Sequence, residues 1–348
     1  MGERRVRRRL VLSTLLLVVV MAAALGIGAV SISPLELSAI LASLAGIHLP
    51  WPYDERQVTT LMAIRVPRVL TSALVGAAWA CAGLAMQAIY RTPLADPALV
   101  GVGAGAALGA TSALSIALAL GIAAEPSGTL SVTLGAFTTA LVAAVIVHRV
   151  AVASGGVVVA TMLLAGIALT ALFAALTAIV ITASRDADLG SVALWSLGSL
   201  SGAGGRDVLV VAAVLLPATG LLAWLGPRLD ALALGEAEAG HLGVEVRGLG
   251  LLVSVVFVLL TAVAVAVAGV IAFVGLMVPS LARAWVGVSH RAAVIASALL
   301  GATLLVVADV LARSLFGPVE LPVGVITTVL GAPFFLALML RERWLLAR

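Results

Sequence analysis

Side chains that could do chemistry are few in this sequence, and arginine is the most frequent of them. All twenty basic residues are arginine, and no lysine occurs. A phosphate-binding loop of the pattern GxxxxGK[ST] needs a lysine, so the chain has no such loop with which to hydrolyse ATP. The four histidines and the single cysteine, Cys81, are dispersed without the spacing of metal ligands, so we expect no metal site.

Ionisable side chains inside apolar stretches are rarer still. Asp309 and Arg313 are four residues apart, so a helix would bring both to one face. This spacing fits an ion pair at a helix end, and a docking role fits equally well. An ion-coupled carrier generally needs ionisable groups at membrane depth, and these two residues are among the few candidates. No Ser–His, paired-aspartate or HExxH arrangement falls within the apolar stretches, which disfavours an intramembrane enzyme.

The elements that position these side chains must be membrane helices. The 348 residues are 63% hydrophobic and 10% charged, with a mean hydropathy of +1.24. Scattered arginines, rather than a basic face, account for the high isoelectric point, so nucleic acid is not an expected partner. Apolar stretches cover residues 10–32, 69–89, 98–122, 129–147, 157–182, 207–226, 249–282, 292–316 and 322–340.

The stretch 249–282 is too long for one membrane crossing. As a single helix its 34 residues would measure roughly 51 Å, against a hydrocarbon core of about 30 Å. Gly269, Gly275 and Pro279 interrupt it, so we expect two spans, the second one short. The predicted fold is all-α: one polytopic membrane domain over residues 1–348, with about ten transmembrane helices.

Ten spans place both termini on the same side, and the arginines indicate which side. This topology puts fourteen arginines inside and six outside, so N- and C-termini are predicted to be cytoplasmic. The apolar stretch that begins at Leu10 is longer than the apolar region of a signal peptide, which favours a retained first helix over a cleaved leader. The heptad RTPLADP, residues 91–97, then becomes a tight cytoplasmic turn in which Asp96 caps the following helix.

A longer cytoplasmic connection, residues 227–248, has the character of a protein-binding segment. Glycines divide it into short helical pieces with an apolar side. Its four acidic residues outnumber its two arginines, so an anionic membrane surface is a poor partner and docking onto a soluble protein is favoured.

Several motifs together resemble those of a known family. They are RVPRVL (65–70), GLAMQ (83–87), RTPLADPALVG (91–101), WSLGSL (195–200), LALGEAEAGHLGV (232–244), AGVIAFVGLMVPSLAR (268–283), ADVLAR (308–313) and ELPVGVITTVLGAPFF (320–335). With these motifs the chain resembles, nearly end to end, the permease subunits of bacterial ATP-binding-cassette (ABC) importers for iron-siderophore, haem or cobalamin. The family usually has Asn where Thr92 stands, Pro and Gly where Val270 and Ala272 stand, and His where Ser280 stands.

The resemblance implies a type II ABC importer permease of the cytoplasmic membrane. Such a permease works as a homodimer with two cytoplasmic ATP-binding subunits and a periplasmic or lipid-anchored substrate-binding protein. No cofactor would be bound covalently, and ATP with Mg would be held by the partner ATPase. Arg65, Arg68 and Arg313 would dock the binding protein. The ATPase-coupling residues would be Leu232, Leu234, Gly235, Glu236, Ala239, Leu242 and Gly243.

Substrate and pathway are less defined by the sequence. An iron chelate, ferric siderophore or haem, is the first expectation; a cobalamin importer permease and an ion-coupled secondary transporter are the alternatives. The small residues Ala165, Gly166 and Thr170 fit the wall of a pathway, and they fit close helix packing equally well.

Overall fold

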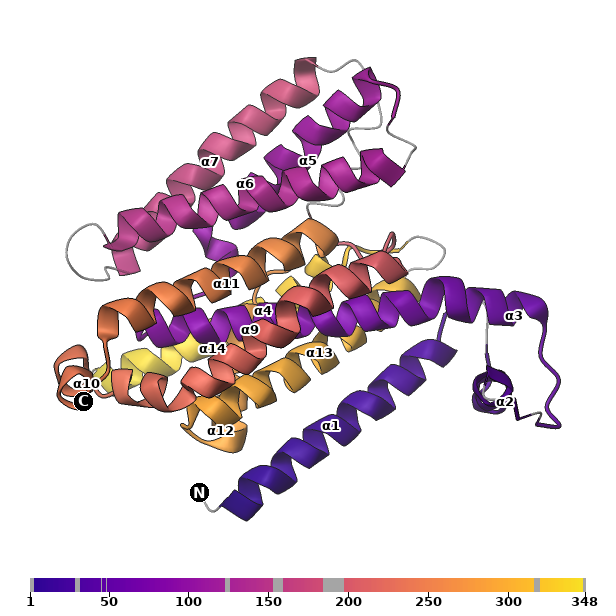
Figure 1. Ribbon diagram of the computed structural model, residues 1–348, viewed down its shortest axis with the longest axis horizontal. Helices are drawn as coiled ribbons and strands as arrows, with labels where there is room; N and C mark the ends of the chain where they lie inside the picture. The colour runs from indigo at the N-terminus through magenta and orange to yellow at the C-terminus, as the bar shows by residue number, and fades with distance from the viewer. Residues whose placement is uncertain are drawn as a thin grey trace.

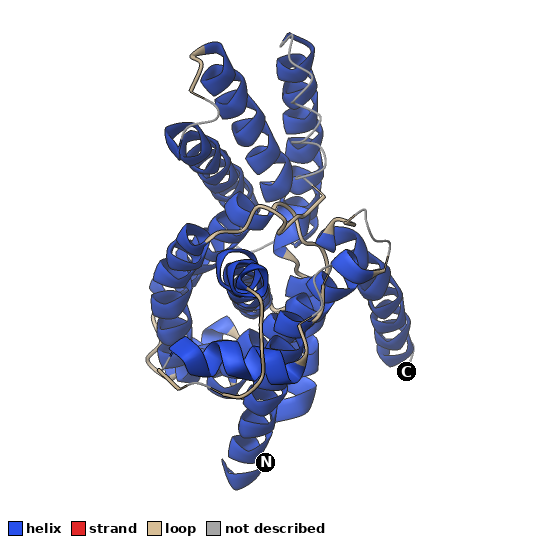
Figure 2. Ribbon diagram, turned by 90° about the vertical axis from the view of Figure 1, so that its right-hand side faces the viewer, coloured by secondary structure: helices blue, strands red, loops and turns tan. Residues whose placement is uncertain are grey.

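The computed structural model describes residues 3–28, 32–44, 46–47, 49–122, 126–152, 159–183, 197–315 and 320–346, and these ranges contain helices and no strand (Figures 1 and 2). The elements are α1 (Glu3–Gly26), α2 (Pro34–Leu44), α3 (Glu55–Thr59), the π-helical turn η1 (Thr60–Arg65), α4 (Val66–Tyr90), the 3₁₀ turn η2 (Pro97–Val100), α5 (Val102–Ala119), α6 (Pro126–Val152), α7 (Val159–Ala183), α9 (Gly205–Leu232), α10 (Glu236–His241), α11 (Val246–Ala268), α12 (Val274–Val286), α13 (His290–Ser314) and α14 (Val323–Leu346).

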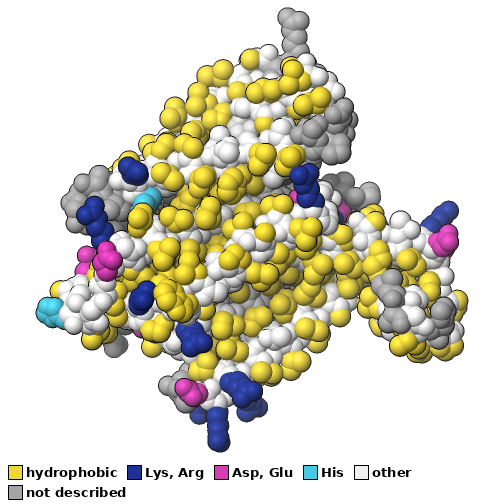
Figure 3. Space-filling view, in the orientation of Figure 1, with side chains coloured by type: hydrophobic (Ala, Val, Ile, Leu, Met, Phe, Trp, Pro, Cys, Tyr) yellow, Lys and Arg dark blue, Asp and Glu magenta, His cyan; other side chains and the backbone are white. Residues whose placement is uncertain are grey.

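The all-α, multi-span architecture predicted from the sequence is confirmed. Eight described helices are long and apolar enough to cross a membrane, and three shorter apolar helices, α2, α12 and α14, accompany them. Figure 3 shows the corresponding surface: apolar side chains cover the middle of this face, and charged ones gather toward its ends. Because lipid tails cannot satisfy polar groups, this banding is typical of a protein that spans a bilayer.

The long apolar stretch divides into two helices as expected. α11 ends at Ala268 and α12 begins at Val274. The chain turns at Gly269, whose φ is 68°, and at Phe273, a non-glycine residue with a φ of 66°. Gly275 and Pro279 lie within α12 instead of at the break. A left-handed conformation, not the proline, therefore ends the longer helix.

α4 is the centre of the bundle. It packs against α9, α11, α12 and α13, and 89% of its apolar stretch is buried (Figures 1 and 2). Glycines allow this close approach: a Cβ added to Gly83 would lie 1.9 Å from the carbonyl oxygen of Gly275. Small residues at helix contacts are the usual device for packing helices in lipid.

A second layer consists of α5, α6 and α7, which pack on one another above the central bundle in Figure 1. α7 is the opposite of α4, because only 6% of its apolar stretch is buried. Its exposed side chains include Leu164 and Ile167, which are 68% and 66% exposed. One face of this layer is therefore left uncovered by the described part of the chain.

Candidate functional site

The segment between α9 and α11 forms one end of the bundle, at the left of Figure 1. α10 is a six-residue helix that starts after Gly235, whose φ of 132° is strained for any other residue. A second glycine, Gly243, has a φ of 79° and closes the segment before α11. Glycine at these two positions gives the chain two sharp turns around one short helix.

The seven residues predicted to couple to an ATPase differ in burial, because some are packed inside the protein and others are exposed. Leu232 and Ala239 are buried, at 4% and 0% exposure. Leu234 and Leu242 are 68% and 64% exposed, so two large apolar side chains point away from the protein. These two side chains are the exposed apolar part of the segment, and their contact with an ATPase stays a prediction.

Glu236, the first residue of α10, binds Arg91 of the RTPLADP heptad. The Arg91 Nη2 atom lies 2.7 Å from Glu236 Oε1, and the two side chains are 43% and 52% exposed. The coupling segment and the heptad are far apart in sequence, and nothing in the composition of either predicts this contact.

The heptad is more than the tight surface turn predicted from the sequence. Arg91 is exposed, but the chain then enters the protein, where Asp96 is only 2% exposed. Asp96 Oδ1 accepts a hydrogen bond from the Ala98 backbone N–H at 3.0 Å, which is the predicted cap. Asp96 Oδ2 accepts another from the Phe273 N–H at 3.2 Å, at the break between α11 and α12.

Gln87 adds a connection between α4 and α12 that sequence reasoning did not assign. Its amide nitrogen lies 3.3 Å from the carbonyl oxygens of both Gly275 and Leu276. Its amide oxygen accepts from Arg283 of α12. The motif GLAMQ contained the residue, but only the fold shows which backbone groups it meets.

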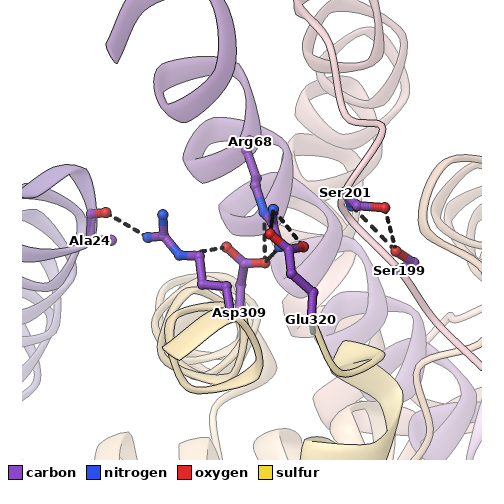
Figure 4. A network of polar contacts seen from close by, with 7 residues as sticks. Ala24, Arg68, Ser199, Ser201, Asp309 and Glu320 are labelled. Carbon is purple, nitrogen blue, oxygen red and sulfur yellow. Dashed lines mark hydrogen bonds and ion pairs between the residues drawn. The ribbon is translucent and has the colours of Figure 1, made fainter. Parts of the chain in front are cut away.

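At the opposite end of the bundle, buried charges form a network (Figure 4). Arg68 Nη2 lies 2.9 Å from Asp309 Oδ1, and the two side chains are 8% and 1% exposed. The Nη1 atom of Arg68 lies 3.0 Å from Glu320 Oε2, which is the exposed member at 45%. Three helical regions, α4, α13 and the approach to α14, are joined by this network.

The other two predicted docking arginines bind the end of α1. Arg65 donates to the carbonyl oxygens of Leu25 at 2.7 Å and Gly26 at 3.1 Å. Arg313 donates to the Ala24 carbonyl and lies 3.7 Å from Asp309, so the predicted ion pair on α13 is present. Cations are favoured at a helix C-terminus because its last carbonyl groups have no partner in the helix.

Arg65, Arg68 and Arg313 are thus brought together, but their guanidinium groups are directed into the protein. Arg65 and Arg68 are 4% and 7% exposed as residues, and the Arg313 side chain is 6% exposed. Sequence reasoning missed Glu320, although it opens one of the recognised motifs. Its exposure makes it the accessible part of the network, and contact between these arginines and another protein stays a prediction.

The three residues predicted to line a pathway lie on α7. Thr170 is exposed and donates to the Gly166 carbonyl at 2.7 Å. Gly166 is buried and lies against Gly101, which follows the turn η2. A Cβ added to Gly101 would lie 3.1 Å from the carbonyl oxygen of Gly166. Ala165 is half-buried. One face of this part of α7 therefore packs against the protein, and the other face is exposed.

The sequence and the structure are similar to those of known transport proteins. Residues 15–341 match the model of the FecCD transport family. The chain is 42% identical over 282 residues to the hemin transport system permease protein HmuU of Yersinia pestis, which covers 80% of this chain and 83% of the relative. It is 37% identical over 309 residues to the cobalamin import system permease protein BtuC of Halobacterium salinarum, covering 85% and 80%.

A solved structure is also similar over nearly its whole length. An inward-facing structure of an ABC transporter assigned to the metal-chelate type superposes with a TM-score of 0.80 at 30% identity. The match covers 96% of this chain and 99% of the other. The described fold is thus that of a type II ABC importer permease.

Proposed function

The chain belongs to the FecCD transport family, and we propose that it forms the pathway through which an ATP-driven importer moves an iron chelate, ferric siderophore or haem, across the cytoplasmic membrane. The observation that carries this proposal is the family match over residues 15–341. It spans both the exposed coupling segment and the uncovered layer of small residues.

ATP hydrolysis in such importers belongs to a separate subunit. The missing lysine agrees with this division, because the chain has no Walker-type phosphate loop. ATP and Mg are accordingly proposed to bind the partner ATPase, with no cofactor attached to this chain. Leu234 and Leu242 would enter a groove on that subunit, and closure of the ATPase would move α9 and α11 through α10.

A second copy of the chain is proposed to cover the open layer. The exposed large side chains of α7, Leu164 and Ile167 among them, need either lipid or protein against them. In a homodimer, Ala165, Gly166 and Thr170 would line the pathway where the two copies meet. Small side chains there would leave room for a bulky chelate and bind it weakly.

The substrate-binding protein is proposed to dock on the outer end, over the network of Arg65, Arg68 and Arg313. Because these groups are buried, a carboxylate of the binding protein reaches Arg68 only when Glu320, the exposed member, moves away. Docking by exchange of one carboxylate for another costs little, since the charge on Arg68 is compensated before and after.

The orientation follows from the arginines. In Figure 1, α1 begins and α14 ends toward the end of the bundle that carries α10. We assign that end to the cytoplasm, because the predicted excess of arginine lies there. The protein would then be a multi-pass protein of the bacterial cytoplasmic membrane with both termini inside.

Cobalamin is the second candidate cargo, favoured by the similarity to the cobalamin permease of Halobacterium salinarum. Uptake of haem, ferric siderophore and cobalamin by the reconstituted complex, each with its own binding protein, would separate these possibilities. Uptake driven by a proton or sodium gradient without the ATPase would instead indicate a secondary transporter.

The coupling assignment is tested by replacing Leu234 with arginine. Leu234 is 68% exposed, so the change should leave the fold intact and weaken binding of the ATPase subunit, by roughly tenfold for a large apolar side chain at a docking centre. Arg149→Glu, on an exposed residue near the end of α6, is the control. Normal ATPase binding and normal uptake by Leu234→Arg would contradict the assignment.

A further inference from the structure

We propose that Arg91 and Asp96 are positioning residues that transmit motion of the coupling helix α10 to the start of α12, so that the RTPLADP loop acts as a link between the ATPase surface and the membrane core. The inference rests on the proposed function, because it needs an ATPase that moves α10. It assigns a role to residues that were predicted only to form a turn.

The first connection is the ion pair between Glu236 and Arg91, at 2.7 Å. Glu236 is the first residue of α10, so it moves with the helix that we assign to the ATPase. Arg91 follows the last residue of α4 and begins the loop. Both side chains are about half exposed, so the pair can form and break without desolvating a charge.

The second connection is the hydrogen bond from the Phe273 N–H to Asp96. Each Asp96 oxygen has its own donor: Oδ1 accepts from Ala98 and Oδ2 from Phe273. The carboxylate therefore holds the turn η2 and the start of α12 together. Pro97 adds a steric contact, since its Cδ lies 2.9 Å from a Cβ placed on Gly275.

A short loop joins the two connections. Four residues lie between Arg91 and Asp96, so the two are at most about 17 Å apart even in extended chain. Pro93 and Pro97 fix the φ angle at two positions within the heptad. In the proposed link, a displacement of Arg91 is passed on to Asp96 through this short loop, whose prolines limit backbone rotation.

Backbone strain is found at both ends of this link. Among the described residues, the non-glycine positions with positive φ are Arg91, at 50°, and Phe273, at 66°. Side chains disfavour this conformation, and strained positions of this kind are concentrated at switches and functional sites. One of the two carries the ion pair to α10, and the other donates the hydrogen bond to Asp96.

Aspartate, and not asparagine, is required at the inner end. An amide has one acceptor oxygen and one NH2 group, so Asp96→Asn can satisfy only one of the two backbone N–H groups. The side chain keeps its shape, which makes the variant a test of the link more than of folding. At the outer end, the matched test is a charge exchange between Arg91 and Glu236.

The experiment follows the motion of α12 in the full complex. Permease with Val288→Cys, an 85% exposed residue two positions beyond the end of α12, is spin-labelled and combined with its ATPase subunit in nanodiscs. The native Cys81 is buried and stays unlabelled. Pulsed electron paramagnetic resonance measures how ATP changes the distance between the labels on the two permease subunits. ATP hydrolysis and ATPase binding are recorded in parallel.

We expect Arg91→Glu and Glu236→Arg each to reduce the fraction of ATPase-bound complexes that respond to ATP about two- to fivefold, as for an exposed pair. ATPase binding should be retained in Arg91→Glu, because Arg91 lies outside the proposed ATPase surface. The double exchange should restore it, because the ion pair re-forms with its charges exchanged. Asp96→Asn should reduce it about tenfold, since a buried bond to a charged group is lost. Arg149→Glu is the charge-reversal control and should have no effect.

Three results would overturn the link: unchanged responses in the single variants, no recovery in the double exchange, or an Asp96→Asn protein that responds like the parent. Failure of the proposed function would look different. It would be shown by a parent complex that binds no ATPase subunit or does not respond to ATP, whatever residues stand at positions 91, 96 and 236.

Discussion

Two ion pairs at opposite ends of the bundle lie in opposite surroundings. At the end away from α10, called the outer end after the proposed orientation, Arg68 and Asp309 are 8% and 1% exposed, and the arginine also binds Glu320. At the other end, Arg91 and Glu236 are 43% and 52% exposed and form a single contact. Both pairs have distances below 3 Å, so contact length alone does not distinguish them.

The surroundings decide what each pair can do. A buried charge that loses its partner stays uncompensated, so the outer network fixes the positions of α4 and α13. An exposed charge is solvated again when its partner leaves, so the contact between Arg91 and Glu236 can change during a transport cycle at small cost. The outer network is suited to fixed architecture, and the inner pair is suited to movement.

The largest effect should come from the outer end. Asp309→Ala leaves Arg68 and Arg313 buried without their shared carboxylate, and we expect a loss of about 3–5 kcal/mol in the free energy of unfolding. Chemical denaturation in detergent micelles would measure it. Glu320→Gln is the control, because Glu320 is 45% exposed and its removal should cost far less. Equal stability of the two variants would show that burial of Asp309 does not make it more important to the fold than the exposed Glu320.

A moderate effect is expected when only the exposed member of the outer network is changed. Glu320→Gln frees Arg68 for a partner's carboxylate, so association with the substrate-binding protein should become up to about fivefold faster. The gain should shrink as salt rises above roughly 0.1 M, where charges are screened over about 10 Å. Slower or salt-independent association would count against docking over these arginines.

The smallest effect should come from the inner end. Arg91→Gln removes an exposed ion pair, and the free energy of unfolding should change by less than about 1 kcal/mol. The same denaturation series, performed beside Asp309→Ala, gives the measurement. A loss as large as that of Asp309→Ala would show that the inner pair is structural, and it would remove the basis for a movable link.

The sequence alone determined the fold class and the place of the short helix between α9 and α11. Hydropathy is a local property of each stretch, so a multi-span fold and the division of residues 249–282 could be predicted without knowing any contact. The glycines around Gly235 likewise predicted short helical pieces there, and the docking role of that segment stays a prediction. The capping role of Asp96 was also predictable, because a cap is formed within a few residues.

Only the tertiary structure decided which charges are buried and what they bind. Arg65, Arg68 and Arg313 were predicted at an outer surface, because an arginine near a helix end normally extends to water. Their burial depends on Asp309, Glu320 and the end of α1, which are distant in sequence and brought together by packing. Likewise, Asp96 meets Phe273 across 177 positions. Local patterns carry no information about such pairs, because the interaction energy depends on distance and burial in the folded chain and not on spacing in the sequence.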